Sequence, residues 1–263
     1  MNINLSGKKA FVCGSTQGIG KAAALELANL GASIVLLARN EDSLRQVKDE
    51  LSDAQNQRHD YIVADFSKPA ELKNKVDEYL KTNPSPVHIL INNTGGPAAG
   101  KAIDANLEEF MNAFQAHLIC NQILAQSLVD GMKAERYGRI INVISTSVKQ
   151  PIPNLGVSNT IRGAVAAWAK TLAGELGEFG ITVNNVLPGF TKTQRLESIV
   201  ENKANKTGAS IERIEEEMKS ETPAKRFAEA SEVADAIAFL ASPAASYING
   251  INLPVDGGRT SSL

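Results

Sequence analysis

The alternation of short apolar runs with amphipathic stretches is the feature that most restricts how this chain can fold. Runs rich in β-branched residues alternate with segments of helical periodicity almost to the C-terminus. Such alternation is typical of βαβ units, in which a parallel sheet is covered by helices on both faces. The sequence therefore predicts an α/β, doubly wound fold of about seven parallel strands, in a single domain spanning residues 1–263. The expected strands are Ala10–Cys13, Ser33–Ala38, Asp60–Ala64, His88–Ile91, Arg139–Ile144, Ile181–Leu187 and Asn249–Val255.

The composition excludes several classes of protein. Hydrophobic residues make up 43% of the 263 residues and charged residues 21%, so a full core can form. The net charge of −2 and the absence of a long run of like charge argue against a general nucleic-acid or membrane-surface binder. Two cysteines, Cys13 and Cys120, are too few for a disulfide framework or a metal cluster, and we expect both to be buried. No secretory signal or membrane-spanning run is evident, which favours a cytoplasmic protein.

A glycine-rich turn follows the first predicted strand and leads directly into a helix. Its glycines have the spacing G-x-x-x-G-x-G. Glycine lets the backbone turn tightly and approach a pyrophosphate, whose charge the helix N-terminus stabilises. In this strand-turn-helix context the pattern indicates a dinucleotide-binding Rossmann fold, and the alternative is a tight turn without a ligand. The residues expected to contact the cofactor here are Gly14, Ser15, Thr16, Gly18, Ile19 and Gly20.

Arg39 follows the second predicted strand, at the place where an acidic residue would bind the ribose 2′-hydroxyl of NAD. A guanidinium suits a 2′-phosphate instead, so NADP(H) is favoured over NAD(H). The alternative is that Arg39 is an ordinary surface charge. Glu41 and Asp42 are better explained as first-turn residues of a helix that Asn40 caps.

Residues 191–228 interrupt the alternation with a long and highly charged stretch before a predicted helix near Ser231–Leu240. Two interpretations stay open. The stretch could be a pair of solvated surface helices, or it could be a lid over the ligand at the strand ends, because long loops in compact domains are often functional.

Several motifs occur in the order that characterises one family, and the chain resembles the short-chain dehydrogenase/reductase family over essentially its whole length. The glycine turn is similar to the family's TGxxxGxG, with Cys13 in place of threonine, and Asn92-Asn93-Thr94-Gly95 resembles its NNAG motif. Val255-Asp256-Gly257-Gly258 resembles the family's C-terminal signature. The resemblance implies further cofactor contacts, near the adenine and the nicotinamide, at Asp65, Phe66, Asn92, Thr94, Gly95, Pro188, Gly189, Thr191 and Thr193.

The likeness is strongest to the 3-oxoacyl-[acyl-carrier-protein] reductases, and especially to a divergent branch that carries NNTGGP and SNxxR. The family's catalytic tetrad is Asn, Ser, Tyr and Lys. By position, the resemblance implies that Ser145 is the catalytic serine, while Ser158 replaces the tyrosine and Arg162 the lysine. His117 stands where the asparagine is expected.

These replacements change the chemistry that the site can perform. Carbonyl reduction needs a proton donor for the developing alkoxide, and serine is a far weaker acid than a phenol. Arg162 keeps its proton at neutral pH, because the ordinary pKa of a guanidinium lies far above 7, so it can stabilise negative charge but cannot relay a proton. His117, with an ordinary pKa of about 6.5, suits proton exchange at neutral pH. We therefore predict a proton path from the substrate oxygen through Ser158 and water to His117.

Each of these residues also has a structural interpretation. Ser158 could cap a helix that begins at Asn159, because serine is a preferred N-cap residue. Arg162 could pair with a carboxylate or phosphate in the cleft, and His117 could be a buried core or interface histidine.

The sequence thus favours an NADP(H)-dependent oxidoreductase that reduces a carbonyl of a small molecule, with a 3-oxoacyl thioester among the substrates that the resemblance implies. The alternative is a catalytically silent dinucleotide sensor or assembly partner. The helix expected over 161–176 is apolar on more than one face and must therefore be buried. In the family this helix and the one over about 110–132 form a two-fold interface, so we expect a homotetramer or a homodimer.

Overall fold

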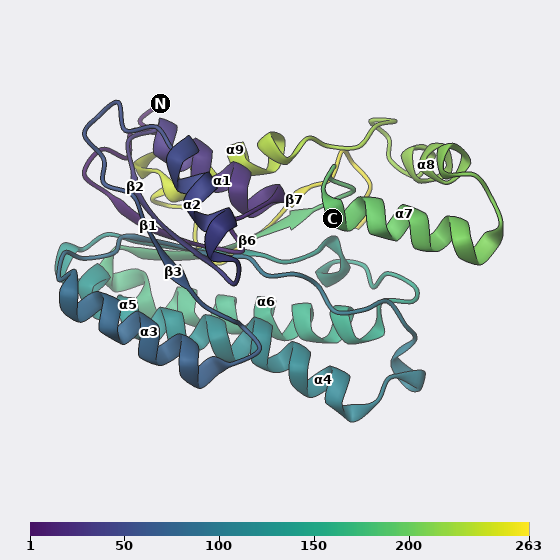
Figure 1. Cartoon of the computed structure of the whole chain (residues 1–263), viewed down its shortest axis with the longest axis horizontal. Helices are drawn as coiled ribbons and strands as arrows, with labels where there is room; N and C mark the ends of the chain where they lie inside the picture. Colours follow the sequence, from purple (N-terminus) through teal and green to yellow (C-terminus); the bar gives the residue numbers. More distant parts are fainter. Residues whose placement is uncertain (263) are drawn as a thin grey trace.

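The computed structural model describes residues 1–262, which are organised around one parallel sheet (Figure 1). The strand order is β3-β2-β1-β4-β5-β6-β7, and each neighbouring pair is parallel. The predicted doubly wound fold is therefore confirmed. The strands are β1 Lys9–Cys13, β2 Ser33–Ala38, β3 Asp60–Val63, β4 Ile89–Asn92, β5 Gly138–Val143, β6 Ile181–Pro188 and β7 Asn252–Val255.

Helices cover both faces of the sheet, because successive strand residues point to opposite sides and both sides are apolar. In β1, Val12 packs into the core on one face and Phe11 into the core on the other. The first face is covered by α1 Gly18–Asn29, α2 Glu41–Glu50 and α9 Ala230–Ala241 (Figure 1). The second is covered by α3 Pro69–Thr82, α5 Cys120–Glu135 and α6 Gly156–Leu176, with α4 Leu107–Phe114 leading into α5.

The last strand starts three residues later than predicted. Gly250 has a φ of +74°, which is left-handed and incompatible with a strand. The Asn249 side chain accepts a hydrogen bond from the Val183 N–H and donates one to the Ala173 carbonyl. Residues 249–251 therefore form a turn tied to β6 and α6, and their apolar character alone did not reveal it.

Four asparagines form a ladder across the strands β4 to β7. Their Nδ2 groups donate to the next Oδ1 at 2.8, 2.9 and 2.8 Å. These side chains satisfy one another inside the sheet, where an unpaired amide would be costly. The exception is the Oδ1 of the first, which has no partner among residues 1–262. The members of this asparagine ladder are Asn92, Asn142, Asn185 and Asn252.

Residues 191–228, which we call the lid segment, contain α7 Gln194–Thr207 and α8 Ile211–Ser220 and extend beyond the carboxyl end of the sheet (Figure 1). The pair is polar outside but encloses an apolar cluster of its own, because its apolar residues recur at helical spacing. That cluster consists of Leu196, Val200, Ala204, Ile214, Met218 and Phe227. Within the described part of the chain, helix length and hydropathy together fall short of what a membrane span requires.

Candidate active site

The glycine turn lies after β1, beside β4, where the order of strands reverses direction and where ligands of such sheets bind. Gly14 and Gly18 have φ values of +58° and +54°. A Cβ on Gly20 would lie 2.1 Å from the Gly14 carbonyl oxygen, so no side chain fits there. The turn is thus held in its tight form by backbone contacts that only glycine permits.

Asn93 fastens this turn to the neighbouring strand. Its Nδ2 donates to the carbonyl oxygens of Cys13 and Gly14, each at 3.3 Å. Cofactor contacts are expected at the residues on either side, Asn92 and Thr94, but not at Asn93. The motif that contains Asn93 was recognised in the sequence. Which of the two adjacent asparagines, Asn92 or Asn93, faces β1 depends on the backbone conformation at the end of β4.

The N-terminus of α1 is left open to a ligand. It has no side-chain cap and no acidic residue in its first turn. The N-termini of α2, α4, α7 and α8 each have a side-chain cap, whereas those of α3 and α6, like that of α1, have none. The Ser15 hydroxyl, fully buried in the turn, has no partner among the described residues. Free N–H groups and an unpaired hydroxyl at a helix N-terminus fit a phosphate group.

The residues expected near the adenine follow β2 and β3. Arg39 is exposed and forms no ion pair with any residue of the described range 1–262. A backbone hydrogen bond from Ser67 lowers the pKa of Asp65, and the charge of Arg39 contributes to this shift. The Phe66 side chain packs into the core on the face of the sheet that α3, α5 and α6 cover. Asn92 is likewise committed to the asparagine ladder through its Nδ2.

The predicted nicotinamide segment leaves β6 at Pro188. The Gly189 N–H donates to the Val255 carbonyl at 2.9 Å, and a Cβ on Gly189 would lie 2.7 Å from the Asp256 Cα. The buried Thr191 donates its hydroxyl to the Gly189 carbonyl at 3.2 Å. Glycine is therefore needed here for the close approach of two backbone segments.

Thr193 connects the lid segment to the glycine turn. Its hydroxyl caps α7 by accepting from the Leu196 N–H at 3.3 Å. Its methyl carbon lies 3.1 Å from where a Cβ on Gly18 would be. The start of the lid segment thus packs directly against the first helix and its turn.

The two predicted catalytic serines follow β5. The Ser145 hydroxyl oxygen accepts from the Ser147 N–H at 3.1 Å, so its proton can be donated elsewhere. Ser158 lies inside α6, and its side chain makes no hydrogen bond within the described chain. The alternative interpretation of Ser158 as a cap is wrong, because α6 begins at Gly156, whose N–H donates to the Gly100 carbonyl at 2.9 Å.

His117 occupies a π-helical turn, Gln115–Ile119, that joins α4 to α5, a kind of irregularity frequent at functional sites. Its Nδ1 is hydrogen bonded to the Thr94 hydroxyl at 2.6 Å. Burial, and then the charge of Arg162, lower the pKa of His117 to about 3. The expectation of an ordinary pKa near 6.5 is therefore wrong, and a neutral imidazole can pass a proton but cannot store one at pH 7.

Arg162 lies one helical turn after Ser158, on the same face of α6. Its Nη1 donates to the Val143 carbonyl at 2.7 Å. Burial, and then the charge of Arg195, lower the pKa of Arg162 to about 10, which leaves it charged at neutral pH. The structure thus brings Thr94, His117, Arg162 and Arg195 close together. Arg195 was not predicted as a site residue, because it lies in the polar lid segment, where charged residues are common.

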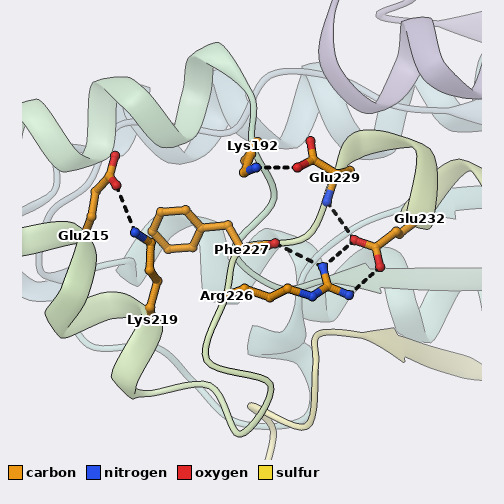
Figure 2. A network of polar contacts seen from close by, with 7 residues as sticks. All are labelled: Lys192, Glu215, Lys219, Arg226, Phe227, Glu229 and Glu232. Atoms are coloured by element: carbon orange, nitrogen blue, oxygen red, sulfur yellow. Dashed lines mark hydrogen bonds and ion pairs between the residues drawn. The ribbon is translucent and has the colours of Figure 1, made fainter. Parts of the chain in front are cut away.

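Both ends of the lid segment are attached to the start of α9 by ion pairs (Figure 2). Lys192 pairs with Glu229, and Arg226 forms two hydrogen bonds of 2.6 Å with Glu232. The Glu229 N–H also donates to Glu232, at 2.9 Å. Because all of these side chains are exposed, each pair adds little to the stability of the fold.

Comparisons with known proteins match this arrangement over nearly the whole chain. A family model described as enoyl-(acyl carrier protein) reductase matches residues 14–260. An NADPH-dependent reductase, BacG, of Bacillus subtilis (strain 168) is 32% identical over 259 residues, covering 98% of this chain and 100% of the relative. A 3-oxoacyl-[acyl-carrier-protein] reductase, FabG, of Vibrio cholerae is 34% identical over 258 residues, covering 97% and 98%. The crystal structure of L-sorbose reductase from Gluconobacter frateurii, complexed with NADPH and L-sorbose, has a TM-score of 0.93 at 31% identity and covers 100% of both chains.

Proposed function

The chain belongs to the short-chain dehydrogenase/reductase family, and on this premise we propose that it is an NADPH-dependent oxidoreductase that reduces a carbonyl of a small molecule. The observation that carries the proposal is the uncapped N-terminus of α1 behind the glycine turn. This feature fits an anionic dinucleotide, and the relatives named above are reductases. The alternative of a silent sensor is therefore not favoured.

The chain offers a set of groups that would hold the coenzyme along the carboxyl edge of the sheet. The backbone from Gly14 to Gly20 would bind the pyrophosphate, and Arg39 would bind the 2′-phosphate. Thr191 and Thr193 would lie beside the nicotinamide, as the family resemblance implies. When bound, NADPH supplies the hydride, and the net change is carbonyl plus NADPH plus a proton to alcohol plus NADP⁺.

The catalytic roles that we propose follow from the side chains described above. The hydroxyls of Ser145 and Ser158 donate hydrogen bonds to the substrate carbonyl oxygen, and Arg162 stabilises the negative charge that develops there. Ser158 passes its proton to the oxygen and recovers one from water. The neutral His117, hydrogen bonded to Thr94, relays that proton from solvent rather than storing it. The 3-oxoacyl thioesters are one substrate class to test, because FabG is a 3-oxoacyl-[acyl-carrier-protein] reductase.

A single experiment tests the reaction class. We expect the purified chain to oxidise NADPH in the presence of short 3-oxoacyl thioesters, oxo acids, ketoses or aldehydes, with one alcohol formed for each NADPH consumed. Coenzyme binding is measured first, by NADPH fluorescence. Tight binding without turnover of any carbonyl compound would restore the sensor interpretation, and no binding of either coenzyme would refute the proposal.

Replacing Arg39 by alanine tests the coenzyme preference. Charge-assisted hydrogen bonds contribute about 1.5 to 3 kcal/mol, so we expect the Kd for NADPH to rise about 10-fold to 100-fold. The Kd for NADH should stay the same, because NADH lacks the phosphate. Arg45→Ala is the matched control, since Arg45 is equally exposed but pairs with Glu41 in α2. Equal loss of both coenzymes would contradict the assignment.

Assembly and location are parts of the same proposal. A homotetramer or homodimer would form through α5 and α6. The surface of α6 supports this, because Gly163 and Gly174 leave open space where a Cβ would lie. Small residues of this kind allow two helices to approach closely. We propose a cytoplasmic location for the assembled protein.

A further inference from the structure

Two arginines are buried among residues 1–262, and their surroundings differ in a way that points to a ligand. Arg139, 3% exposed, donates to the carbonyl oxygens of Gly138, Gly180 and Ser242 and stacks 4.2 Å from the Tyr137 ring. Backbone carbonyl oxygens and the Tyr137 ring therefore stabilise the buried charge of Arg139.

Arg162 is almost as buried, at 8% exposed, but has far fewer partners. Its Nη1 donates to one carbonyl oxygen, that of Val143, and its Nε has no partner among residues 1–262. No acidic side chain of the described chain forms an ion pair with it. Because a buried charge without partners is costly, this arrangement is incomplete without a counter-charge.

A second guanidinium faces the same place from the lid segment. Arg195, in the first turn of α7, donates from Nη2 to the Pro97 carbonyl at 2.8 Å and also has no ion pair within the described residues. The Nη2 atoms of Arg162 and Arg195 lie 3.8 and 3.9 Å from the point where a Cβ on Gly96 would lie. The two cations therefore converge on the loop that follows β4.

The nearby titratable group does not neutralise them. His117 is uncharged at neutral pH, and Arg162 is charged, since its pKa is lowered only to about 10. One of these positive groups, Arg162, is buried and the other, Arg195, is exposed, and an anion between them would stabilise both. Gly96 has no side chain that could separate an anion from the two guanidiniums.

We propose that Arg162 and Arg195 clamp an anionic group of the substrate, so that the preferred substrates carry a carboxylate or phosphate close to the reacting carbonyl. The position fits this role, because Arg162 lies one helical turn from Ser158 and Gly96 follows Thr94 closely in sequence. Carboxylate groups and phosphate groups can each accept two parallel hydrogen bonds from the N–H donors of a guanidinium. Because one arginine belongs to α6 and the other to α7, a bound anion also ties the lid segment to the body. This inference rests on the proposed function, because it takes the bound anion to be part of the substrate of a carbonyl reduction.

The first test measures binding without turnover. Malonate and inorganic phosphate are titrated calorimetrically into the NADP⁺-loaded protein, whose coenzyme phosphate sites are already filled. We expect one saturable site for at least one anion, weakened at least tenfold in Arg195→Gln and less than twofold in Arg213→Gln. Arg213 is the control because it is an exposed cation of the same lid segment that pairs with Glu217. Malonate binding alone assigns a carboxylate, and phosphate binding alone assigns a phosphate.

The second test measures selectivity in turnover. Acetoacetate is compared with ethyl acetoacetate, and dihydroxyacetone phosphate with dihydroxyacetone, because each pair differs chiefly in charge. We expect the higher kcat/KM for the anionic member of at least one pair, with the ratio reduced at least tenfold in Arg195→Gln.

The outcomes separate the two proposals. Anion binding without reduction of any carbonyl would support the clamp and refute the reductase. Reduction of neutral ketones without anion binding or preference would support the reductase and overturn the clamp. If Arg162→Gln weakens NADP⁺ binding as much as it weakens anion binding, Arg162 serves the coenzyme and the clamp is also overturned.

Discussion

Replacing Gly20 by alanine is expected to abolish coenzyme binding while leaving the protein folded. The added Cβ would lie 2.1 Å from the Gly14 carbonyl oxygen and 2.6 Å from the Asn93 Nδ2, so it would push apart the two groups that hold the turn. The backbone N–H groups would then no longer converge on a phosphate. We expect the Kd for NADPH to rise at least about 100-fold, which corresponds to about 2.8 kcal/mol of binding free energy.

Gly100→Ala is the matched control for this prediction. Gly100 has no atom within 4 Å of where its Cβ would be, and its φ is not in the left-handed region. This variant should therefore keep the wild-type Tm and bind NADPH as before. Fluorescence titration measures the affinities, and circular dichroism verifies the fold. Wild-type affinity in Gly20→Ala would show that the turn does not bind the coenzyme.

The second large effect that we expect is a loss of folding stability at acid pH that originates at His117. Its pKa is lowered to about 3 by burial and by Arg162, whereas in the unfolded chain it is about 6.5. Between these values the unfolded chain binds a proton that the folded protein does not, so the free energy of unfolding falls as the pH falls. The expected contribution is about 1.4 kcal/mol for each pH unit below about 6.5, ending near pH 3.

His117→Gln isolates this contribution, because glutamine keeps a hydrogen-bonding group near Thr94 but does not titrate. Urea unfolding at several pH values between 7 and 4 should show a smaller loss of stability in the variant than in the wild type. The His117 ring resonances of the wild type should not shift between pH 8 and 5 in NMR spectra. A midpoint near 6.5 would refute the buried, neutral histidine and would return His117 to the role of proton source.

The strands were predictable because each is a short apolar run between turn residues, and burial on both faces leaves such runs little alternative. The start of β7 was not, since it depends on the side chain of Asn249 bonding to β6 and α6. The start of α6 was missed for a similar reason. Gly156 is placed by the loop at Gly100, more than fifty residues earlier in the chain.

The glycine turn was predictable because its glycines lie, in the sequence, directly between the strand and the helix that they connect. The electrostatics of the site were not visible. The pKa of His117 depends on burial and on Arg162, which comes from a different helix. The approach of Arg162 and Arg195 to each other near Gly96 depends on how the lid segment packs. The pattern of charges along one helix does not reveal which residues of other elements face that helix.

The asparagine ladder has a consequence for how precisely the site can be assembled. A slip of one residue in any of these strands would turn its asparagine to the opposite face and leave the neighbouring amides buried and unpaired. The hydrogen bonds between these asparagines therefore fix the register of β4, β5 and β6 relative to one another, and with it the relative positions at which these strands end. Thr94, Ser145 and Gly189 follow those ends closely, so their alignment at the edge of the sheet is set by side chains that lie within the sheet.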